Sequence, residues 1–411
     1  MKIQVNTETG KVRSLIMHAP GQEVENMTPI NAERALYSDI LNLPLAKKEH
    51  QQFSELLEKY VNVFYIKDLL REIIRQPALK EDLIEEICQL EGNYDECDAL
   101  MALSDEWLIK QLIEGIPLQR NTLSKYLSKE KYALKPLHNL FFTRDIAFCI
   151  GEEVFISNMA SRVRKRESML LKFILENHVY FQCNTIDLIN YNALKDYSVE
   201  GGDILVVNDN LILVGNGSRT TSVGIDKLIE HFKNKEKPFN IIVQELPSSP
   251  ESFIHLDMVF TLLDKDLCMI YEPLILRNYK FQTISISIKG DNVDIQQEVN
   301  LLEALKKQGV DLDYVLCGGN SDVWLQEREQ WHSGANYFNL APGKVIGYER
   351  NAYTLESLSK KGYEVKSSAD VISNPSLIDQ YKRLAVTIEG SELPRGGGGP
   401  RCMTLPLHRE D

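Results

Sequence analysis

Short apolar segments recur along the chain, and longer amphipathic segments separate them. The short segments are rich in Val, Ile and Phe, a composition typical of buried strands. We expect strands at Val12–Met17, Val61–Ile66, Ile146–Ile150, Glu153–Ser157, Ile204–Val207, Leu211–Val214, Ile241–Gln244, Met258–Leu263 and Val345–Tyr348. The longer segments have an apolar period near 3.6, which predicts helices at Ala46–Lys59, Glu167–Glu176, Ser222–Phe232 and Val299–Lys307.

The order of these segments indicates the fold class. Asp209-Asn210 lies between two predicted strands and is a plausible hairpin turn. The succession of strand, strand, helix and strand recurs along the chain. We therefore expect an α/β architecture built from repeated units.

The part of the chain from about Leu69 to Leu127 departs from this pattern, because almost nothing in it is strand-like. Its apolar residues follow the helical period instead. They are Leu69, Leu70, Ile73, Ile74, Leu83, Ile84, Ile87, Leu90, Trp107, Leu108 and Leu112. We interpret residues 69–127 as an all-helical insertion into one domain formed by residues 1–68 and 128–411. The alternative is that these helices belong to the main layers of that domain.

Composition and charge narrow the class of protein. The chain has 411 residues, 43% of them hydrophobic and 26% charged, as in ordinary soluble globular proteins. Its net charge of −13 argues against nucleic acid or an anionic membrane as a partner. No apolar run approaches the roughly 18 residues of a membrane span, and the N-terminus turns polar too soon for a signal peptide. We therefore expect a cytoplasmic protein.

The seven cysteines are scattered, with no Cys-x-x-Cys and no cluster with histidine. They are Cys88, Cys97, Cys149, Cys183, Cys268, Cys317 and Cys402. This spacing predicts neither a disulfide framework nor a structural zinc site. One cysteine could instead be a nucleophile.

Two segments place carboxylates next to predicted strands. Arg144 and Asp145 end a segment that begins at Asn139 and leads into a strand; an ordinary surface ion pair is the alternative. The segment Glu200–Asp203 combines two carboxylates with two glycines, which let the backbone approach a ligand closely. A tight acidic turn without a ligand is the alternative.

A third segment pairs an imidazole with a carboxylate. On an extended chain His255 and Asp257 would face the same side, because alternate residues share a face. A neighbouring carboxylate raises the pKa of an imidazole and orients it for acid–base catalysis. The pattern His-x-Asp also occurs often by chance.

The fourth segment delivers a cysteine on a glycine-rich loop. Four glycines, residues 396–399, precede Cys402, and Arg401 could help to stabilise its thiolate. A phosphate-binding loop is disfavoured, since no Lys-Ser/Thr and no helix signature follow the glycines. A buried structural cysteine is the other alternative.

Together the four segments contain one thiol, one histidine and several carboxylates. They show no metal-ligand spacing and no nucleotide fingerprint. A planar guanidinium cation suits two carboxylates through paired N–H groups, and a thiolate can attack its central carbon. If the four segments meet in space, they favour guanidine chemistry.

The order and spacing of motifs over nearly the whole chain resemble the arginine deiminase family, part of the guanidino-group-modifying superfamily with the pentein fold. The motifs are Met17–Glu23, Phe142–Asp145, Met159–Glu167, Glu200–Asp203, Ser218–Thr220, His255–Asp257, Arg328–Trp331, Gly334–Asn336, Pro342-Gly343, Tyr348–Asn351 and Gly399–Met403. The helical insertion also fits this family and distinguishes it from the compact dimethylarginine hydrolases.

The resemblance implies five pseudo-symmetric ββαβ units in a propeller around a central channel. It also implies hydrolysis of L-arginine by water to L-citrulline and ammonia, the first step of arginine dihydrolase catabolism, with no cofactor and no metal. It further implies a homo-oligomer, either a dimer or a tetramer.

The site residues follow from the same resemblance. Cys402 matches the nucleophile, His255 the general acid and base, and Glu200 a carboxylate near the reacting centre. Asp145 and Asp257 match the carboxylates that hold the guanidinium. The residues that match substrate-binding positions are Asp203 for the α-amino group, Arg164 and Arg219 for the α-carboxylate, and Asn139 and Phe142 in the lining.

The glycine-rich loop departs from the family pattern. The family commonly has an arginine where this chain has Gly397, so the resemblance leaves open how the loop closes and whether Arg395 substitutes. The alternative functions are another guanidine hydrolase acting on agmatine or a methylarginine, an amidinotransferase, and a pentein kept for binding without turnover.

Overall fold

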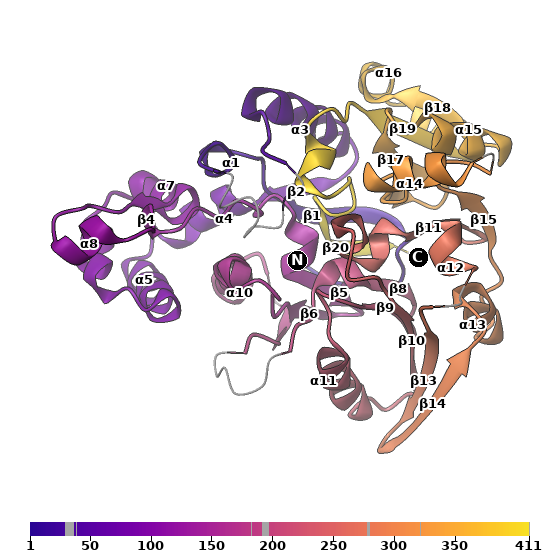
Figure 1. Ribbon diagram of the computed structural model, residues 1–411, viewed down its shortest axis with the longest axis horizontal. Coiled ribbons are helices and arrows are strands. Elements are labelled where there is room, and N and C mark those ends of the chain that lie inside the picture. The colour runs from indigo at the N-terminus through magenta and orange to yellow at the C-terminus, as the bar shows by residue number, and fades with distance from the viewer. Residues whose placement is uncertain are drawn as a thin grey trace.

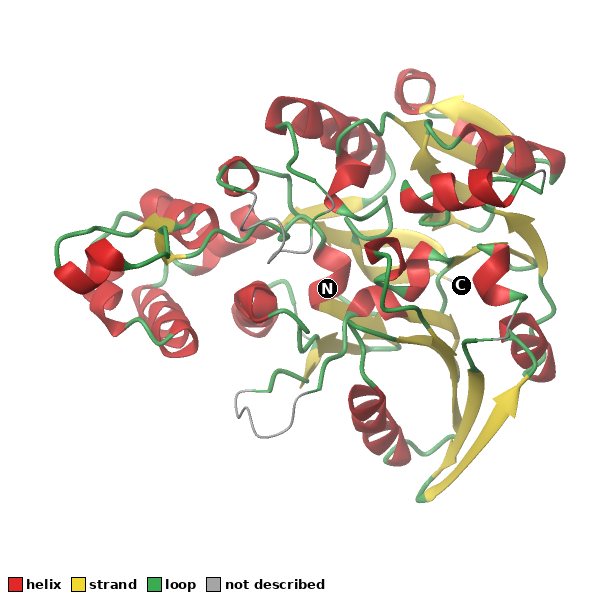
Figure 2. Cartoon of the chain, in the orientation of Figure 1, coloured by secondary structure: helices red, strands yellow, loops and turns green. Residues whose placement is uncertain are grey.

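Five sheets surround a common centre, with helices on the outside (Figures 1 and 2). The computed structural model describes residues 1–28, 37, 39–181, 183–190, 197–277, 280–320 and 322–410. In each sheet two antiparallel strands are followed by a helix and then by a strand parallel to the second. The expected arrangement of five ββαβ units is therefore confirmed.

The first unit joins the two ends of the chain. Its strands are β20 (Leu405–Glu410), β1 (Lys11–Met17) and β2 (Asn62–Tyr65), and its helix is α3 (Leu43–Glu58). Strand β1 pairs antiparallel with β20 and parallel with β2. The C-terminal strand therefore closes the ring and places the preceding loop near the centre.

The second and third units lie next along the chain. The second contains β5 (Ala147–Ile150), β6 (Glu153–Ile156), α10 (Lys165–Asn177) and β7 (Asn184–Asp187). The third contains β8 (Ile204–Asn208), β9 (Leu211–Asn216), α11 (Ser222–Lys233) and β10 (Phe239–Glu245). A hairpin of β13 (Thr283–Lys289) and β14 (Asn292–Glu298) extends the sheet of the third unit.

The fourth and fifth units complete the ring. The fourth contains β11 (Phe260–Asp264), β12 (Leu267–Ile270), α13 (Leu301–Lys307) and β15 (Asp313–Leu316). The fifth contains β16 (Phe338–Ala341), β17 (Lys344–Tyr348), α15 (Ala352–Lys360), β18 (Glu364–Ser367) and β19 (Leu384–Ile388).

The apolar segments form the strands because sheets and helices bury them from both sides. All four residues of β5 and β12 are buried, as are all five of β19. The predicted strands and helices are confirmed with small shifts of their ends. One shift matters for the site: the segment predicted as a strand from Met258 becomes extended only at Phe260, after a 3₁₀ turn at Leu256–Met258.

The residues interpreted as an insertion project to one side of the ring (Figure 1). They form α4 (Ile66–Ile73), α5 (Pro77–Glu91), a 3₁₀ turn (Tyr94–Glu96), α6 (Cys97–Met101), α7 (Asp105–Glu114) and α8 (Leu123–Leu127). A short sheet of β3 (Ile116–Pro117) and β4 (Tyr132–Leu134) is also present, so the segment is not entirely helical. The division of the chain at residues 69 and 127 stays a prediction.

The expectation of unpaired cysteines is corrected within this projection. Cys88 at the end of α5 and Cys97 at the start of α6 form a disulfide. A turn of the chain brings the two helix ends together, which the spacing of the cysteines did not reveal. The other five cysteines are free. Among the described residues no helix is long and apolar enough to cross a bilayer.

Candidate active site

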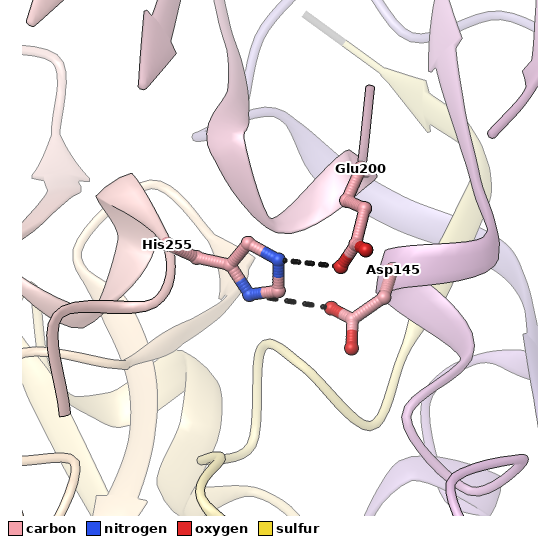
Figure 3. A group of neighbouring side chains, drawn as sticks. All are labelled: Asp145, Glu200 and His255. Carbon is pink, nitrogen blue, oxygen red and sulfur yellow. Dashed lines mark hydrogen bonds and ion pairs between the residues drawn. The ribbon is translucent and has the colours of Figure 1, made fainter. Parts of the chain in front are cut away.

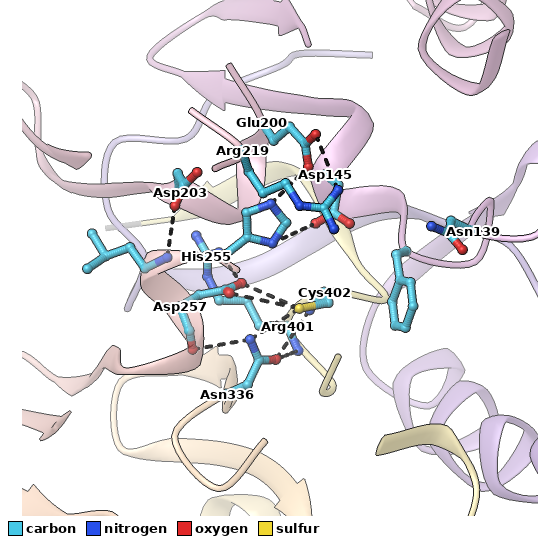
Figure 4. A network of polar contacts seen from close by, with 12 residues as sticks. Asn139, Asp145, Glu200, Asp203, Arg219, His255, Asp257, Asn336, Arg401 and Cys402 are labelled. Atoms are coloured by element: carbon cyan, nitrogen blue, oxygen red, sulfur yellow. Dashed lines mark hydrogen bonds and ion pairs between the residues drawn. The ribbon is translucent and has the colours of Figure 1, made fainter. Parts of the chain in front are cut away.

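A small cavity lies at the centre of the ring, and residues of three of the four predicted segments line it (Figure 4). Its lining consists of Asn139, Phe142, Asp145, Arg164, Arg219, Ile254, His255, Gly396, Gly397 and Cys402. The cavity volume of about 10 Å³ leaves room for roughly one water molecule. A larger ligand therefore requires this lining, which includes two glycines of the glycine-rich loop, to rearrange.

Hydrogen bonds to its carbonyl oxygen, its sulfur and its backbone N–H group hold Cys402 at the cavity. Its carbonyl accepts a hydrogen bond from the backbone N–H of Arg144 (3.0 Å). The side-chain amide of Asn336 donates to its sulfur (3.2 Å), and the amide oxygen of Asn336 accepts from the backbone N–H groups of Arg401 (3.1 Å) and Cys402 (3.4 Å). A side chain at Gly399 would collide with Asn336, which explains a glycine there.

His255 lies between two buried carboxylates (Figure 3). Its Nε2 is 2.9 Å from Glu200 Oε2, and its Nδ1 is 3.7 Å from Asp145 Oδ1. Burial disfavours a charged imidazole, but Asp145, the hydrogen bond to Glu200 and the charge of Asp203 outweigh it and raise the pKa of His255 to about 9. His255 is therefore protonated at neutral pH.

The expected relation between His255 and Asp257 is corrected. His255 itself is extended, but Asp257 lies in the following 3₁₀ turn, so the two side chains do not share one face of a strand. The carboxylate that orients the imidazole is Glu200. Burial opposes the charge on Glu200, but Arg219 and the hydrogen-bonded His255 lower the pKa of Glu200 to about 2.

Asp257 faces the thiol instead. Its Oδ2 is 3.6 Å from Cys402 Sγ and accepts a hydrogen bond from Arg401 Nη1 at 2.8 Å (Figure 4). Arg401 is also bound to Glu8 (2.8 Å), so its charge is shared by two carboxylates. Burial, Asp257 and Asp145 raise the pKa of Cys402 well above its usual value, and Arg401 opposes this only in part. Without a bound cation the sulfur is therefore a thiol.

The interpretation of Arg144 and Asp145 as a surface ion pair is excluded, because both are buried and have different partners. The guanidinium of Arg144 lies 3.7 Å from Glu8, whereas Asp145 Oδ2 pairs with Arg164 Nη1 at 2.7 Å. Arg164 also contacts Glu167 at 2.9 Å. The guanidinium of Arg164 thus occupies a carboxylate oxygen that the resemblance assigns to the substrate.

The other residues expected to bind substrate fall into two groups. Asn139, Phe142 and Arg219 line the cavity, and Arg219 Nη1 lies 3.8 Å from Glu200. Asp203 does not belong to the lining described for this cavity. It is fully buried, and its Oδ1 accepts from the backbone N–H of Leu256 at 2.9 Å, next to His255. Burial raises the pKa of Asp203 to about 7.

One group of side chains has the spacing of a metal site. Ligand atoms of Asp145, Glu200 and His255 lie within 4.8 Å of one another. Arg164 Nη1, however, is 2.7 Å from Asp145 Oδ2 and 4.0 Å from Glu200 Oε2. A divalent cation there would face this guanidinium at short range. These residues therefore fit a guanidinium better than a metal ion.

Two functional contacts were missed from the sequence. Asn336 belongs to a motif of the resemblance, but nothing in Gly334–Asn336 indicates that its amide reaches the sulfur. Glu8, near the N-terminus, accepts a hydrogen bond from Arg401, which lies 393 residues later in the chain. In both cases the partners meet only because the ring closes.

Comparisons with known proteins agree with this geometry. The sequence profile of the family described as arginine deiminase matches residues 33–409. The chain is 33% identical to an arginine deiminase of Staphylococcus aureus over 427 aligned positions, covering 100% of this chain and 98% of the relative. An amidinotransferase from Microseira wollei of the saxitoxin biosynthetic pathway superposes with a TM-score of 0.56 at 14% identity, covering 100% and 98% of the two chains. A dimethylarginine dimethylaminohydrolase adduct with S-methyl-L-thiocitrulline gives 0.52 at 13% identity, covering 96% and 99%.

A ring of five ββαβ units around a buried thiol, imidazole and carboxylates defines the class of pentein-fold proteins. The full-length match is more specific. The chain belongs to the arginine deiminase family, hydrolases of amidines that convert arginine to citrulline.

Proposed function

We propose that Cys402 is the nucleophile and His255 the general acid and base of L-arginine hydrolysis in this chain. The observation that carries the proposal is that both side chains border one cavity together with Asp145, Arg164 and Arg219. In this proposal Asp145 and Asp257 hold the substrate guanidinium, and Glu200 orients His255.

Substrate binding has two linked consequences in this proposal. The α-carboxylate of arginine pairs with Arg164 and Arg219, so Arg164 releases Asp145 Oδ2, which becomes free for the substrate guanidinium. Asn139 and Phe142 complete the lining. The family resemblance matches Asp203 to the α-amino group. In this structure Asp203 instead accepts a hydrogen bond from the backbone of Leu256 and supports the turn that follows His255, so contact with the α-amino group requires a rearrangement.

The first covalent step uses the charge of the substrate. A cation between Asp145 and Asp257 offsets the two carboxylates that raise the pKa of Cys402, so the thiol gives its proton to solvent as the substrate binds. The thiolate adds to the guanidinium carbon and forms the C–S bond. His255 protonates the departing nitrogen, the C–N bond breaks, ammonia leaves, and an S-alkylthiouronium remains.

The second step reverses the role of His255. The neutral imidazole accepts a proton from water, and the resulting hydroxide adds to the same carbon. The added hydroxyl loses its proton as the C–S bond breaks, which releases L-citrulline and the Cys402 thiol. No cofactor takes part in either step.

Replacing Cys402 by Ala tests this assignment. We expect citrulline formation to fall by at least about 10³-fold, as for loss of a covalent nucleophile. Cys183→Ala is the matched control, because Cys183 is also free but lies outside the cavity lining. Turnover of Cys402→Ala close to that of the parent would refute the assignment.

The choice of arginine over a related guanidine is tested with agmatine, which has no carboxylate. If Arg164 and Arg219 bind the α-carboxylate, kcat/KM for agmatine is lower than for arginine by about 10²-fold or more. In Arg164→Met this preference should shrink. An unchanged preference in that variant would show that Arg164 does not contact the carboxylate.

We also propose a cytoplasmic homo-oligomer, a dimer or tetramer, that supplies the first step of arginine catabolism and has no nucleic-acid or membrane partner. Leu123, Tyr126 and Leu127 of α8 support self-association, because all three are exposed apolar or aromatic side chains. Light scattering coupled to size-exclusion chromatography measures the subunit number.

A further inference from the structure

A buried carboxylate in α3 binds the backbone that leads into the glycine-rich loop. Glu49 is 2% exposed. Its oxygens accept hydrogen bonds from the N–H groups of three consecutive residues: Ser391 at 2.6 Å, Glu392 at 3.1 Å and Leu393 at 2.9 Å. Three successive amides around one anion form a compact anion-binding site of the backbone. Here the anion comes from about 340 residues earlier in the chain.

The bound segment begins the loop that covers the cavity. Leu393–Gly396 forms a 3₁₀ turn, and the N–H group of its first residue, Leu393, needs an acceptor outside the turn. Gly396 ends the turn and Gly397 follows it; both line the cavity, and Gly397 has a φ of +87°, which favours glycine. Cys402 comes five residues later. The position of this turn therefore sets where the cavity cover and the thiol begin.

Neighbouring contacts hold the same stretch to α3 and to the fifth unit. The side-chain oxygen of Gln52 accepts from the N–H of Glu389 (3.0 Å), and the carboxylate of Glu392 accepts from the N–H of Asn42 at the start of α3 (2.9 Å). Arg350 donates to the carbonyl of Gly390 at 2.8 Å. Glu49 lies at the centre of these contacts and is the one that binds three amides.

Glu49 takes no part in the chemistry derived above. It is not in the cavity lining. His255, Cys402 and the aspartates proposed to bind the substrate guanidinium have other partners. Charge-assisted hydrogen bonds to backbone amides are among the stronger ones in proteins, which suits a carboxylate used as an anchor.

We propose that Glu49 is a positioning residue for turnover: it anchors the start of the glycine-rich loop so that the loop covers the site and presents Cys402. The proposal rests on the assignment of Cys402 as the nucleophile. Arg395 does not take the place of the arginine that the family commonly has at the position of Gly397. Its side chain faces outward and pairs with Asp39 and Glu392.

Glu49→Gln tests the anchor while keeping the shape of the side chain. The amide retains one acceptor oxygen, but its NH₂ group faces backbone N–H donors and repels them. We expect kcat per folded molecule to fall at least 10-fold. We also expect Cys402 to react with the neutral reagent iodoacetamide at least threefold faster at fixed pH, because the cover over the thiol loosens.

The folded fraction is measured for each variant from its tryptophan fluorescence unfolding curve, so that a loss of stability alone does not count as a loss of turnover. Glu55→Gln is the matched control: Glu55 lies in the same helix and is exposed, and among the described residues its carboxylate accepts a hydrogen bond only from the side chain of Gln51. We expect kcat and alkylation rate of Glu55→Gln within twofold of the parent.

The proposal is overturned if kcat per folded molecule and the alkylation rate of Glu49→Gln both stay within twofold of the parent. If this variant does not fold, Glu49→Asp carries the test. It keeps the charge on a shorter side chain, and we expect both readouts to change in the same directions by smaller factors; parent-like values would again overturn the proposal. Absence of citrulline formation by the parent enzyme would instead refute the proposed function.

Discussion

His255 shows how burial and charge compete at a single residue. Burial alone would keep its imidazole neutral, yet two carboxylates in contact with it favour the proton. Cys402 also keeps its proton, but there burial and the neighbouring carboxylates act in the same direction and favour the neutral thiol. In the proposed mechanism the resting site therefore holds a protonated general acid, His255, and a protonated nucleophile, Cys402. The bound substrate cation lowers the pKa of the thiol while His255 keeps its proton.

This competition predicts a specific titration. In the folded protein His255 should lose its proton near pH 9 rather than near its ordinary 6.5. Because the folded-state pKa is raised, the associated stabilisation is fully present below about pH 6.5 and is lost as the pH rises through about 9. In Glu200→Gln the midpoint should move to lower pH, since the variant removes the anionic partner at 2.9 Å. NMR titration of ¹⁵N-labelled histidines measures both midpoints.

A control for this titration is Glu153→Gln. Glu153 lies 3.0 Å from His231 on another unit, so this variant should leave the midpoint of His255 unchanged. A midpoint for His255 near 6.5 in the parent, or the same midpoint in Glu200→Gln, would contradict the electrostatic account.

Candidate site residues could be predicted from the sequence where one short segment contains several reactive side chains. The segments containing Asp145, Glu200, His255 and Cys402 stand out by their reactive groups and glycines, and the structure brings all four together. Their pairing could not be predicted, because it depends on how five separate units meet. Glu200 therefore orients the imidazole, a role that local spacing suggests for Asp257.

At the scale of elements, a turn of two glycines lets the imidazole lie against the backbone. A Cβ added at Gly202 would be 2.5 Å from Nδ1 of His255 and 2.6 Å from its Cγ, which is closer than atoms can approach. We expect Gly202→Ala to displace the imidazole and reduce kcat by about 10²-fold, at a cost of about 1–3 kcal/mol in unfolding free energy. Steady-state citrulline assays and denaturant unfolding measure the two effects.

Gly217→Ala provides the comparison, because the nearest atom to its added Cβ is Leu246 Cβ at 3.2 Å, away from the imidazole. Its kcat should stay within twofold of the parent. If Gly202→Ala were equally active, the close packing of the turn against His255 would have no catalytic consequence.

Most predicted strands have apolar residues on both faces, yet β12 and β19, which are buried throughout, were not among the strands predicted from the sequence. The hairpin of β13 and β14 was missed for a physical reason: β14 is mostly exposed and polar, so it lacks an apolar signal. The alternating Thr-Ile-Ser-Ile-Ser-Ile of β13 is a half-buried strand pattern that could have been found. The 3₁₀ turn at Leu256–Met258 was also missed, because apolar composition alone does not distinguish a turn from the start of a strand.

The disulfide between α5 and α6 predicts a simple count. Denatured protein kept from reductant should show five free thiols, and seven after reduction. Cys97→Ser should lower the unfolding free energy by up to about 2.5 kcal/mol, the entropy of closing so short a loop, and should leave kcat unchanged. Thiol titration and denaturant unfolding check both statements. Seven thiols without reductant would show that the pair is open, as a reducing compartment favours.

For the whole molecule, ring closure matters more for substrate selection than bulk charge. The net charge of −13 attracts a cation only weakly through salt solution, whereas Asp145 and Asp257 are buried inside the ring and, in the proposed mechanism, contact the substrate cation directly. Ring closure by β1 and β20 places Glu8, Arg401 and Cys402 together. The family resemblance implied five units, but the central contacts exist only when the ends of the chain pair.

The projecting helices share an apolar cluster with the ring. Buried side chains of α4, α5 and α7 belong to one apolar cluster with those of α10, β6 and β10. Since this cluster is continuous from the projection to the ring, we expect the two to unfold together, in one calorimetric peak that coincides with the thermal loss of activity. Leu112→Ala in α7, at a fully buried site, should cost about 2–5 kcal/mol and shift peak and activity loss to the same extent. Two peaks, with only one displaced by Leu112→Ala, would show instead that residues 69–127 fold as an independent domain.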